Sequence, residues 1–338
     1  MQKVAELQTK VKNETFSNVF SPLGLSSVRI AFSKDSNSQR FIIERKDGRD
    51  IEVELHLPKG VAGKIKSMVI FPGCAGDSND MTNIAQSFVK KGFAAWTVDF
   101  SVGETESQDF EDYTISQLVK DVKDVVDYVY NHESVDQAQL YIAGHSFGSF
   151  SSLLYLARSQ DERIKGAIGI CPVVDIFEVG FNHTAKLLEK LHHFGRILRV
   201  WMWRTKRLLK KAAFFFWRLT GKMFVLKKNG KWVYLTRKFM KDILHVNSRE
   251  KVMKELSQIK QPCLLLYGDQ DPWVSHEHVQ EIGDNISADN KNVIALEDEG
   301  HMPLGQAGAD KILRKTITWL EKIALGIPAD EPQIFTAN

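Results

Sequence analysis

Cysteine is scarce in this chain, and its spacing excludes two kinds of stabilised scaffold. Cys74, Cys171 and Cys263 lie far apart, are odd in number and form no CxxC or Cys/His pair. Neither a disulfide framework nor a zinc site is therefore indicated. Met1 to Phe16 also lacks the uninterrupted apolar core of a secretory signal. We therefore expect a reducing, cytoplasmic location.

Long hydrophobic runs are missing from the most aromatic part of the chain. Between Arg204 and Leu226 the longest stretch without a charged residue is Ala212 to Trp217, six residues, whereas a helix needs about 20 to span a bilayer. Over its 338 residues the chain is 43% hydrophobic and 26% charged. That composition excludes a disordered or collagen-like chain and is sufficient to bury a large core.

Acidic residues are almost absent from one segment. Residues 181–250 contain 18 Lys and Arg but only three Asp and Glu, a local charge of +15, and since the whole chain carries +3 the remainder carries −12. The same segment holds 12 aromatic residues, including four of the seven tryptophans. This asymmetry indicates a part of the chain with its own surroundings or partner.

Outside that segment, short apolar runs alternate with longer stretches of helical period. Nearly uninterrupted apolar strands that alternate with helices predict an α/β fold, with a mostly parallel central sheet flanked by helices. The predicted strands are Ile51 to Leu57, Ser67 to Phe71, Phe93 to Phe100, Leu140 to Ala143, Ile164 to Ile170, Cys263 to Tyr267 and Val293 to Leu296. The predicted helices are Met81 to Lys91, Ser116 to Tyr130, Ser149 to Arg158, His276 to Ile282 and Lys311 to Ile323. His276 and His278, at the start of the fourth of these helices, are interpreted as solvated.

The N-terminal part has a different pattern. Val28 to Phe32, Arg40 to Glu44 and Ile51 to Leu57 are short and alternating. Asp47-Gly48, between the last two, is a hairpin turn signal. These runs predict an antiparallel edge on the sheet.

The strongest signal for chemistry is Gly144-His145-Ser146-Phe147-Gly148, which follows the strand ending at Ala143 and precedes a helix. A serine on so tight a turn needs small flanking residues, because the backbone approaches itself closely. The turn would present the Ser146 hydroxyl at the N-terminus of the next helix, where backbone amides favour developing negative charge. We interpret Ser146 as a nucleophile.

In these residues the chain resembles the α/β-hydrolase family, whose catalytic groups follow in the order Ser, acid, His. Gly268-Asp-Gln-Asp-Pro-Trp-Val274 resembles the family's acid loop, and Glu299-Gly-His-Met-Pro303 resembles its histidine loop. A serine hydroxyl needs a base, and the base needs a carboxylate that fixes its tautomer. We assign His301 as base and Asp271 as acid. Asp269 is the competing acid and is better suited to bonding the turn.

The resemblance also implies an oxyanion hole after an early strand, in Phe71-Pro-Gly-Cys-Ala-Gly76. Its two donors would be the backbone amides of Cys74 and Phe147. The loop is similar to that of dienelactone-hydrolase-like members, some of which use a cysteine nucleophile. Cys74 is therefore an alternative to Ser146 as nucleophile. If Cys74 is not the nucleophile, we expect it to be a buried, inert thiol. The loop that begins at Asp99 resembles a turn of the family, and the resemblance implies that Asp99 holds this loop beside the oxyanion segment.

The family commonly carries a cap over the active site at the position of the basic segment. We expect a hydrolase core in residues 1–174 and 251–326, a helical basic and aromatic cap in 175–250 and a C-terminal tail in 327–338. Leu187 to Trp201 has helical spacing, and the pattern continues from Arg204 to Leu226. The cap could be a plain lid, could contact an anionic membrane, or could bind an anionic substrate such as an acyl-CoA. No recognised nucleic-acid-binding fold carries the basic residues.

Together these observations predict a serine hydrolase that cleaves carboxylic esters or thioesters through an acyl-enzyme, without a cofactor or metal. An apolar tunnel under an aromatic cap favours medium to long acyl chains. Acyl transfer would use the same three residues. A catalytically silent lipid-binding protein on the same fold is the alternative from another class.

Overall fold

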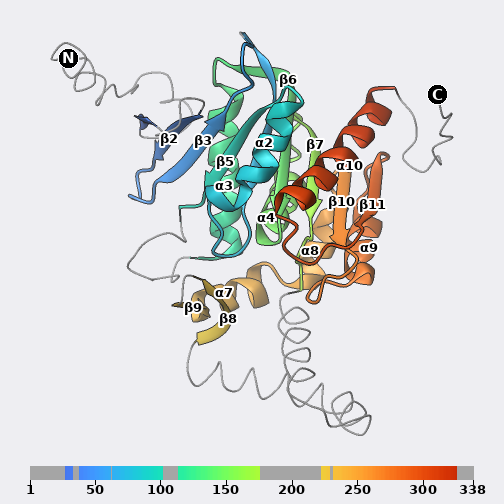
Figure 1. The fold of residues 1–338 in the computed structure, drawn as a ribbon. Coiled ribbons are helices and arrows are strands. Elements are labelled where there is room, and N and C mark those ends of the chain that lie inside the picture. The colour runs from blue at the N-terminus through green and yellow to red at the C-terminus, as the bar shows by residue number, and fades with distance from the viewer. Residues whose placement is uncertain are drawn as a thin grey trace, which may run out of the picture.

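A computed structural model describes residues 27–32, 38–61, 63–101, 113–175, 222–228 and 231–325 of the chain (Figure 1). Within these residues, nine strands form one sheet in the order β1-β2-β3-β5-β4-β6-β7-β10-β11. The strands are β1 (Ser27–Phe32), β2 (Ser38–Glu44), β3 (Ile51–His56), β4 (Ile65–Phe71), β5 (Ala94–Asp99), β6 (Val135–His145), β7 (Ile164–Ile170), β10 (Cys263–Gly268) and β11 (Lys291–Leu296).

Strand direction divides the sheet as the sequence predicts. From β5 through β4, β6, β7 and β10 to β11 every neighbouring pair is parallel. β1, β2 and β3 pair antiparallel, and β3 joins the parallel part by pairing antiparallel with β5. Gly48 adopts φ +73° in the turn between β2 and β3 and donates to the Arg45 carbonyl at 3.0 Å. The predicted α/β fold and its antiparallel N-terminal edge are confirmed.

Helices cover both faces of this sheet, and each face has its own hydrophobic core. The helices of the core are η3 (Ser78–Met81), α2 (Thr82–Lys90), α3 (Ile115–Tyr130), α4 (Phe147–Ser159), α8 (Arg249–Leu256), α9 (His276–Asn285) and α10 (Gln306–Ala324). Apolar residues of α3, α4, α8 and α9 pack in one core, and those of α2 and α10 pack in the other. On α3 the packed residues include five on one apolar face: Leu118, Val122, Val125, Val126 and Val129.

The basic segment differs from its sequence-based prediction. Its described part begins with an antiparallel hairpin, β8 (Lys222–Lys228) and β9 (Lys231–Thr236), followed by α7 (Arg237–Lys241) and the π-helix η5 (Asp242–Val246). The helical prediction for Arg204 to Leu226 is therefore wrong from Lys222 onward. Asn229-Gly230 between two runs rich in β-branched and aromatic residues is a hairpin signal that helical spacing obscured. The predicted helix Leu187 to Trp201 and the predicted tail 327–338 lie outside the described residues.

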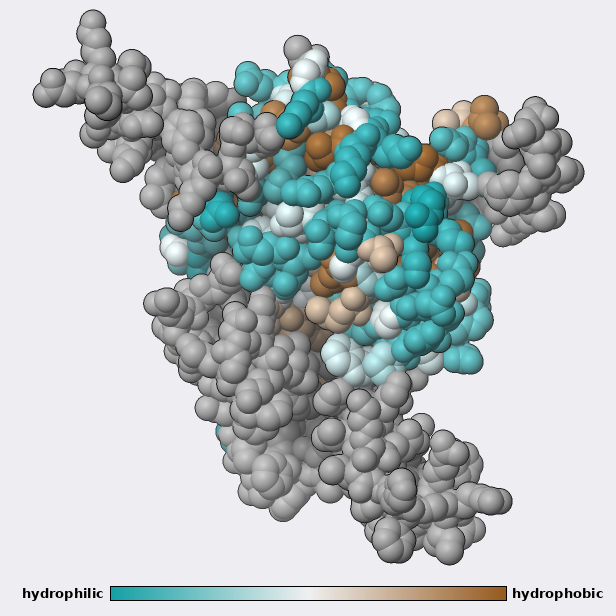
Figure 2. All heavy atoms as spheres, viewed as in Figure 1, coloured by the Kyte–Doolittle hydropathy of each residue, from teal (hydrophilic) through white to brown (hydrophobic). Residues whose placement is uncertain are grey.

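On the face shown in Figure 2, hydrophilic residues cover most of the described surface and hydrophobic residues form small separate groups. The large hydrophobic side chains that are exposed include Val61, Val246, Met302 and Leu325. Among the residues described, no helix combines the length and the apolar character that crossing a membrane requires.

Candidate active site

Ser146 occupies a strained turn between β6 and α4. Its backbone lies at φ +53°, ψ −114°, and its amide donates to the Ile170 carbonyl at 2.9 Å. A Cβ added to Gly144 would lie 2.4 Å from the Gly148 backbone, and one added to Gly148 would lie 2.4 Å from the carbonyl oxygens of the preceding oxyanion segment. Both glycines are therefore required sterically, as the sequence pattern predicts.

Hydrogen bonds connect Ser146 to the two other predicted catalytic residues. His301 Nε2 lies 3.1 Å from Ser146 Oγ, and His301 Nδ1 lies 2.8 Å from Asp271 Oδ2. The three residues follow β6, β10 and β11, whose carboxyl ends meet at one edge of the sheet. A Cβ on Gly268 would lie 2.4 Å from the carbonyl of Glu299, so the acid and histidine loops touch through backbone.

Asp271 is held as a carboxylate in a buried position. Its side chain is 0% exposed, and Oδ1 accepts from the amides of Trp273 at 2.8 Å and Val274 at 3.0 Å. Burial alone would raise the pKa of Asp271, but the hydrogen bond and charge of His301 and the two amides together hold it below its ordinary value. An ionised Asp271 stabilises His301 with its proton on Nδ1, which leaves Nε2 free to accept the Ser146 proton.

Asp269 and Asp99 are the two other acidic residues for which the sequence suggests structural roles. Asp269 is exposed, and its amide donates to the Leu296 carbonyl at 3.3 Å. Asp99 accepts from the Ser78 amide and, at 3.0 Å, from the Ser78 hydroxyl. That pair ties the end of β5 to η3, which follows the oxyanion segment.

The predicted oxyanion segment lies directly against His145 and Ser146. A Cβ on Gly73 would come within 2.8 Å of His145 Nδ1 and 3.3 Å of Ser146 Cβ. Cys74 is partly buried and packs against the core, and Ala75 takes the left-handed conformation at φ +53°. Phe147 is the first residue of α4, immediately after Ser146. The amides of Cys74 and Phe147 remain the predicted oxyanion donors.

Two aromatic rings pack on His301, and neither of them was assigned a role at the site from the sequence. The Trp273 ring lies 4.7 Å from it, centroid to centroid, and the His145 ring lies 5.2 Å from it. His145 Nε2 is 2.7 Å from the His301 carbonyl oxygen. Burial, followed by the charge of His301, lowers the pKa of His145 to about 3, so this histidine is neutral and Nε2 carries the donated proton. His145 therefore fastens the histidine loop to β6.

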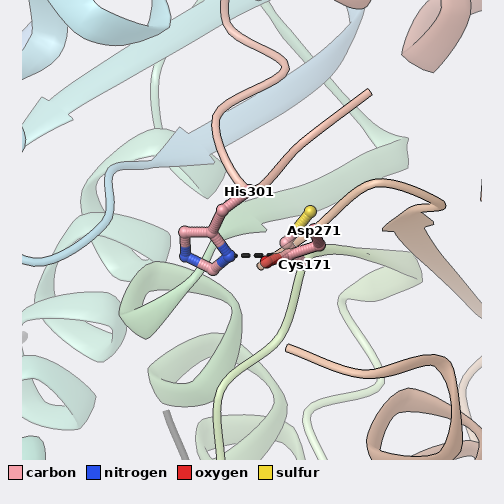
Figure 3. A group of neighbouring side chains, drawn as sticks. All are labelled: Cys171, Asp271 and His301. Atoms are coloured by element: carbon pink, nitrogen blue, oxygen red, sulfur yellow. Dashed lines mark hydrogen bonds and ion pairs between the residues drawn. The ribbon is translucent and has the colours of Figure 1, made fainter. Parts of the chain in front are cut away.

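Cys171 lies beside Asp271 and His301 (Figure 3). One ligand atom from each of Cys171, Asp271 and His301 falls within 4.8 Å of the others, a grouping that suits a soft metal ion by residue type. Burial, then the charge of Asp271, raises the pKa of the Cys171 thiol well above its ordinary value. Because His301 Nδ1 is already bonded to Asp271, we interpret the group as part of the hydrogen-bonded site. No sequence spacing indicated that Cys171 would lie here.

The two histidines of α9, interpreted from the sequence as solvated, have different environments. His276 is exposed and stacks on Tyr267 at 4.7 Å. His278 is buried, and its Nε2 accepts from the Val174 amide at 3.2 Å. The prediction for His278 was wrong because the first turn of α9 faces the segment after β7, a contact between residues distant in the chain.

The fold and this arrangement define the class of the protein: it is an α/β hydrolase. A family model described as serine aminopeptidase, S33, matches residues 63–307, so the chain belongs to that family.

Individual relatives agree with this assignment. Over 134 residues the chain is 26% identical to the quorum-quenching protein AidA of Acinetobacter baumannii (strain MDR-ZJ06), a match that covers 39% of this chain and only 43% of that protein. Est1E from Butyrivibrio proteoclasticus has a similar structure, with a TM-score of 0.58 and 18% identity over 85% of this chain and 100% of Est1E. Alpha/beta hydrolase domain-containing protein 10 from mouse has a TM-score of 0.60 and 16% identity, over 84% and 99% of the two chains. At these identities the structural matches show the fold.

Proposed function

We propose that this hydrolase is a serine enzyme that cleaves carboxylic ester or thioester bonds through an acyl-enzyme. The observation that carries the proposal is the continuous relay from Ser146 Oγ through His301 to Asp271, with distances of 3.1 and 2.8 Å. Nucleophile and base within hydrogen-bond reach, and the base oriented by a third group, form the arrangement that activates a serine.

The chemistry proceeds in two halves. His301 Nε2 takes the Ser146 proton as Oγ attacks the carbonyl carbon, and the amides of Cys74 and Phe147 stabilise the oxyanion. The C–O or C–S bond then breaks, and His301 returns the proton to the leaving alcohol or thiol. In the second half His301 takes a proton from water, the hydroxide attacks the acyl carbon, and Ser146 leaves with the proton as the acid is released.

The substrate proposed is an ester or thioester of a medium to long acyl chain. Apolar surface that shields such a chain contributes binding in proportion to its area. The aromatic residues of the inserted segment support this choice.

A fluorophosphonate probe and a chain-length series test the proposal together. The wild-type protein should be labelled at Ser146 and should hydrolyse p-nitrophenyl and acyl-CoA esters, with kcat/KM rising from short to medium or long chains. Ser146→Ala should abolish labelling and lower kcat by about 10³-fold or more while the protein stays folded. Labelling without hydrolysis would favour acyl transfer, and a folded wild-type protein that is never labelled would favour a silent lipid-binding protein.

We also propose that the basic segment 181–250 contacts anionic lipid surfaces. Its charge of +15 and its four tryptophans support this contact, because basic residues beside aromatic ones are typical of segments that bind at the membrane interface. Within the described part, α7 exposes Arg237, Lys238 and Lys241 while Phe239 and Met240 are buried. The basic side of α7 is thus directed outward.

A further inference from the structure

Three aromatic rings form a stack immediately beside the nucleophile. Tyr113 precedes α3, Phe147 follows Ser146, and Phe239 belongs to α7 of the inserted segment. The ring centroids are 5.7 Å apart for Phe147 and Phe239, 6.2 Å for Tyr113 and Phe239, and 6.4 Å for Tyr113 and Phe147, with interplanar angles of 21°, 23° and 31°. All three side chains are buried. One residue of the insertion therefore packs on two residues of the hydrolase core.

Both core residues of the stack are connected to the predicted oxyanion hole. Phe147 carries one of the two predicted donor amides. The Tyr113 phenol lies beside Cys74, whose amide is the other: burial raises the pKa of the phenol, and the neighbouring Cys74 thiol raises it further. Ala75 lies in the left-handed region, which a residue with a Cβ adopts only when its surroundings hold it there. The stack thus touches both loops whose amides must converge.

The insertion is fixed firmly enough to act on these loops. In η5, Asp242 Oδ2 accepts from the Ser116 amide at 3.1 Å and from Asn247 Nδ2 at 2.8 Å, and Oδ1 accepts from the Ser116 hydroxyl. The Asn247 side-chain oxygen accepts from Arg158 on α4 at 2.7 Å. A buried carboxylate at the first turn of α3 and a cation at the end of α4 therefore hold the residues that follow Phe239.

We propose that Phe239 is a positioning residue of the oxyanion hole, through which docking of the insertion holds the Cys74 and Phe147 amides in their catalytic geometry. This inference rests on the proposed serine hydrolase function. Phe239 acts through Phe147 and Tyr113 and needs no contact with substrate. Because a misplacement of about 1 Å can cost about 10²-fold in rate, loosening the stack lowers stabilisation of the oxyanion more than binding of the ground-state ester.

Phe239→Leu tests the inference, with Phe41→Leu as the matched control. Phe41 is also buried and also packs on neighbouring rings, those of Trp96 and Tyr128, but it lies on β2, four strands from β6. For each variant we would measure the melting temperature, kcat and KM for one p-nitrophenyl ester, and the inhibition constant of a trifluoromethyl ketone with the same acyl chain. The ketone forms a tetrahedral adduct with serine, so its affinity reports the oxyanion hole.

Phe239→Leu should lower kcat by about tenfold or more and weaken binding of the trifluoromethyl ketone by a similar factor, while KM changes by less than about twofold. Phe41→Leu should lower the melting temperature comparably and leave kcat within about twofold. A rise in KM with kcat and ketone affinity unchanged would show that Phe239 only lines a binding surface and would overturn the inference. Equal losses of kcat in both variants would also overturn it.

Tyr113→Phe keeps the test decisive if Phe239→Leu does not fold. It removes only the hydroxyl at Cys74 and Ala75, and it should lower kcat and ketone affinity together by a few-fold at unchanged KM. Unchanged ketone affinity in a folded Tyr113→Phe would refute the link between stack and oxyanion hole.

A wild-type protein that neither hydrolyses esters nor is labelled at Ser146 would overturn the proposed function and this inference together. An active wild type with an unaffected Phe239→Leu would overturn the inference alone.

Discussion

Replacement of Asp271 by Asn removes one charge and reverses the hydrogen-bonding requirement at His301. Asp271 accepts hydrogen bonds on both carboxylate oxygens: Oδ1 from the Trp273 and Val274 amides and Oδ2 from His301 Nδ1. In Asp271→Asn the amide oxygen must stay with the two backbone donors, so the NH2 group faces Nδ1. His301 then has to accept at Nδ1 and carry its proton on Nε2, where it cannot take the proton of Ser146.

The expected loss is large because the wrong tautomer is stabilised in the ground state. A carboxylate-to-amide change at this position of a catalytic triad lowers kcat by about 10⁴-fold, equivalent to about 5 kcal/mol at 1.36 kcal/mol per factor of ten. Asp269→Asn is the matched control: it makes the same chemical change two residues away on an exposed side chain and should change kcat by less than about threefold. Steady-state hydrolysis of a p-nitrophenyl ester gives kcat for both variants and for the wild type. A greater loss in Asp269→Asn would refute our assignment of the acid.

The same variant has a pH-dependent effect on stability. The pKa of folded Asp271 lies below the unfolded value of about 3.9. Its ionisation therefore stabilises the fold above about pH 4, and this contribution disappears as pH falls through the folded pKa. The difference in melting temperature between wild type and Asp271→Asn should be largest near neutral pH and should shrink below about pH 4. A difference that grows on acidification would contradict the lowered pKa.

Three further outcomes follow from the site and the charge distribution. Cys74→Ser should keep kcat within about tenfold, since only the amide of this residue is proposed to act; a folded but inactive variant would transfer the nucleophile role to the thiol. Gly148→Ala should lower activity by about 10²-fold or abolish folding, because its Cβ would lie 2.4 Å from two carbonyl oxygens, whereas Gly305→Ala, with nothing within 4 Å of the added Cβ, should be neutral in both assays. Binding to phosphatidylglycerol vesicles should exceed binding to phosphatidylcholine vesicles and weaken with salt, and equal, negligible pelleting with both would remove the membrane contact. That binding should also fall when five basic residues are changed together to Gln: Arg204, Lys206, Arg207, Lys210 and Lys211.

Local patterns in the sequence were sufficient for the frame of the molecule. Alternating apolar runs and helical periods predicted Ile164 to Ile170 with its observed ends and the other core strands within two residues, except that β6 begins five residues before the predicted Leu140. The agreement arises because each pattern depends on neighbours in the chain. The Gly144 to Gly148 turn was equally readable, since the steric demand that requires its two glycines is confined to five residues. The resemblance to the α/β-hydrolase family, whose catalytic groups follow in the order Ser, acid, His, led to the assignment of Asp271 and His301.

Contacts between distant segments were decided only by the tertiary structure. Nothing in the local sequence places Cys171 beside Asp271, His278 against the Val174 amide or Phe239 on the ring of Phe147, because each contact depends on how separate elements pack. The hairpin β8-β9 was mistaken for a helix for a related reason: short apolar runs mixed with lysines fit both periods, and pairing with a partner strand selects one. The sequence by itself thus determined the sheet, the nucleophile turn and the candidate catalytic residues, and packing decided what surrounds and positions them.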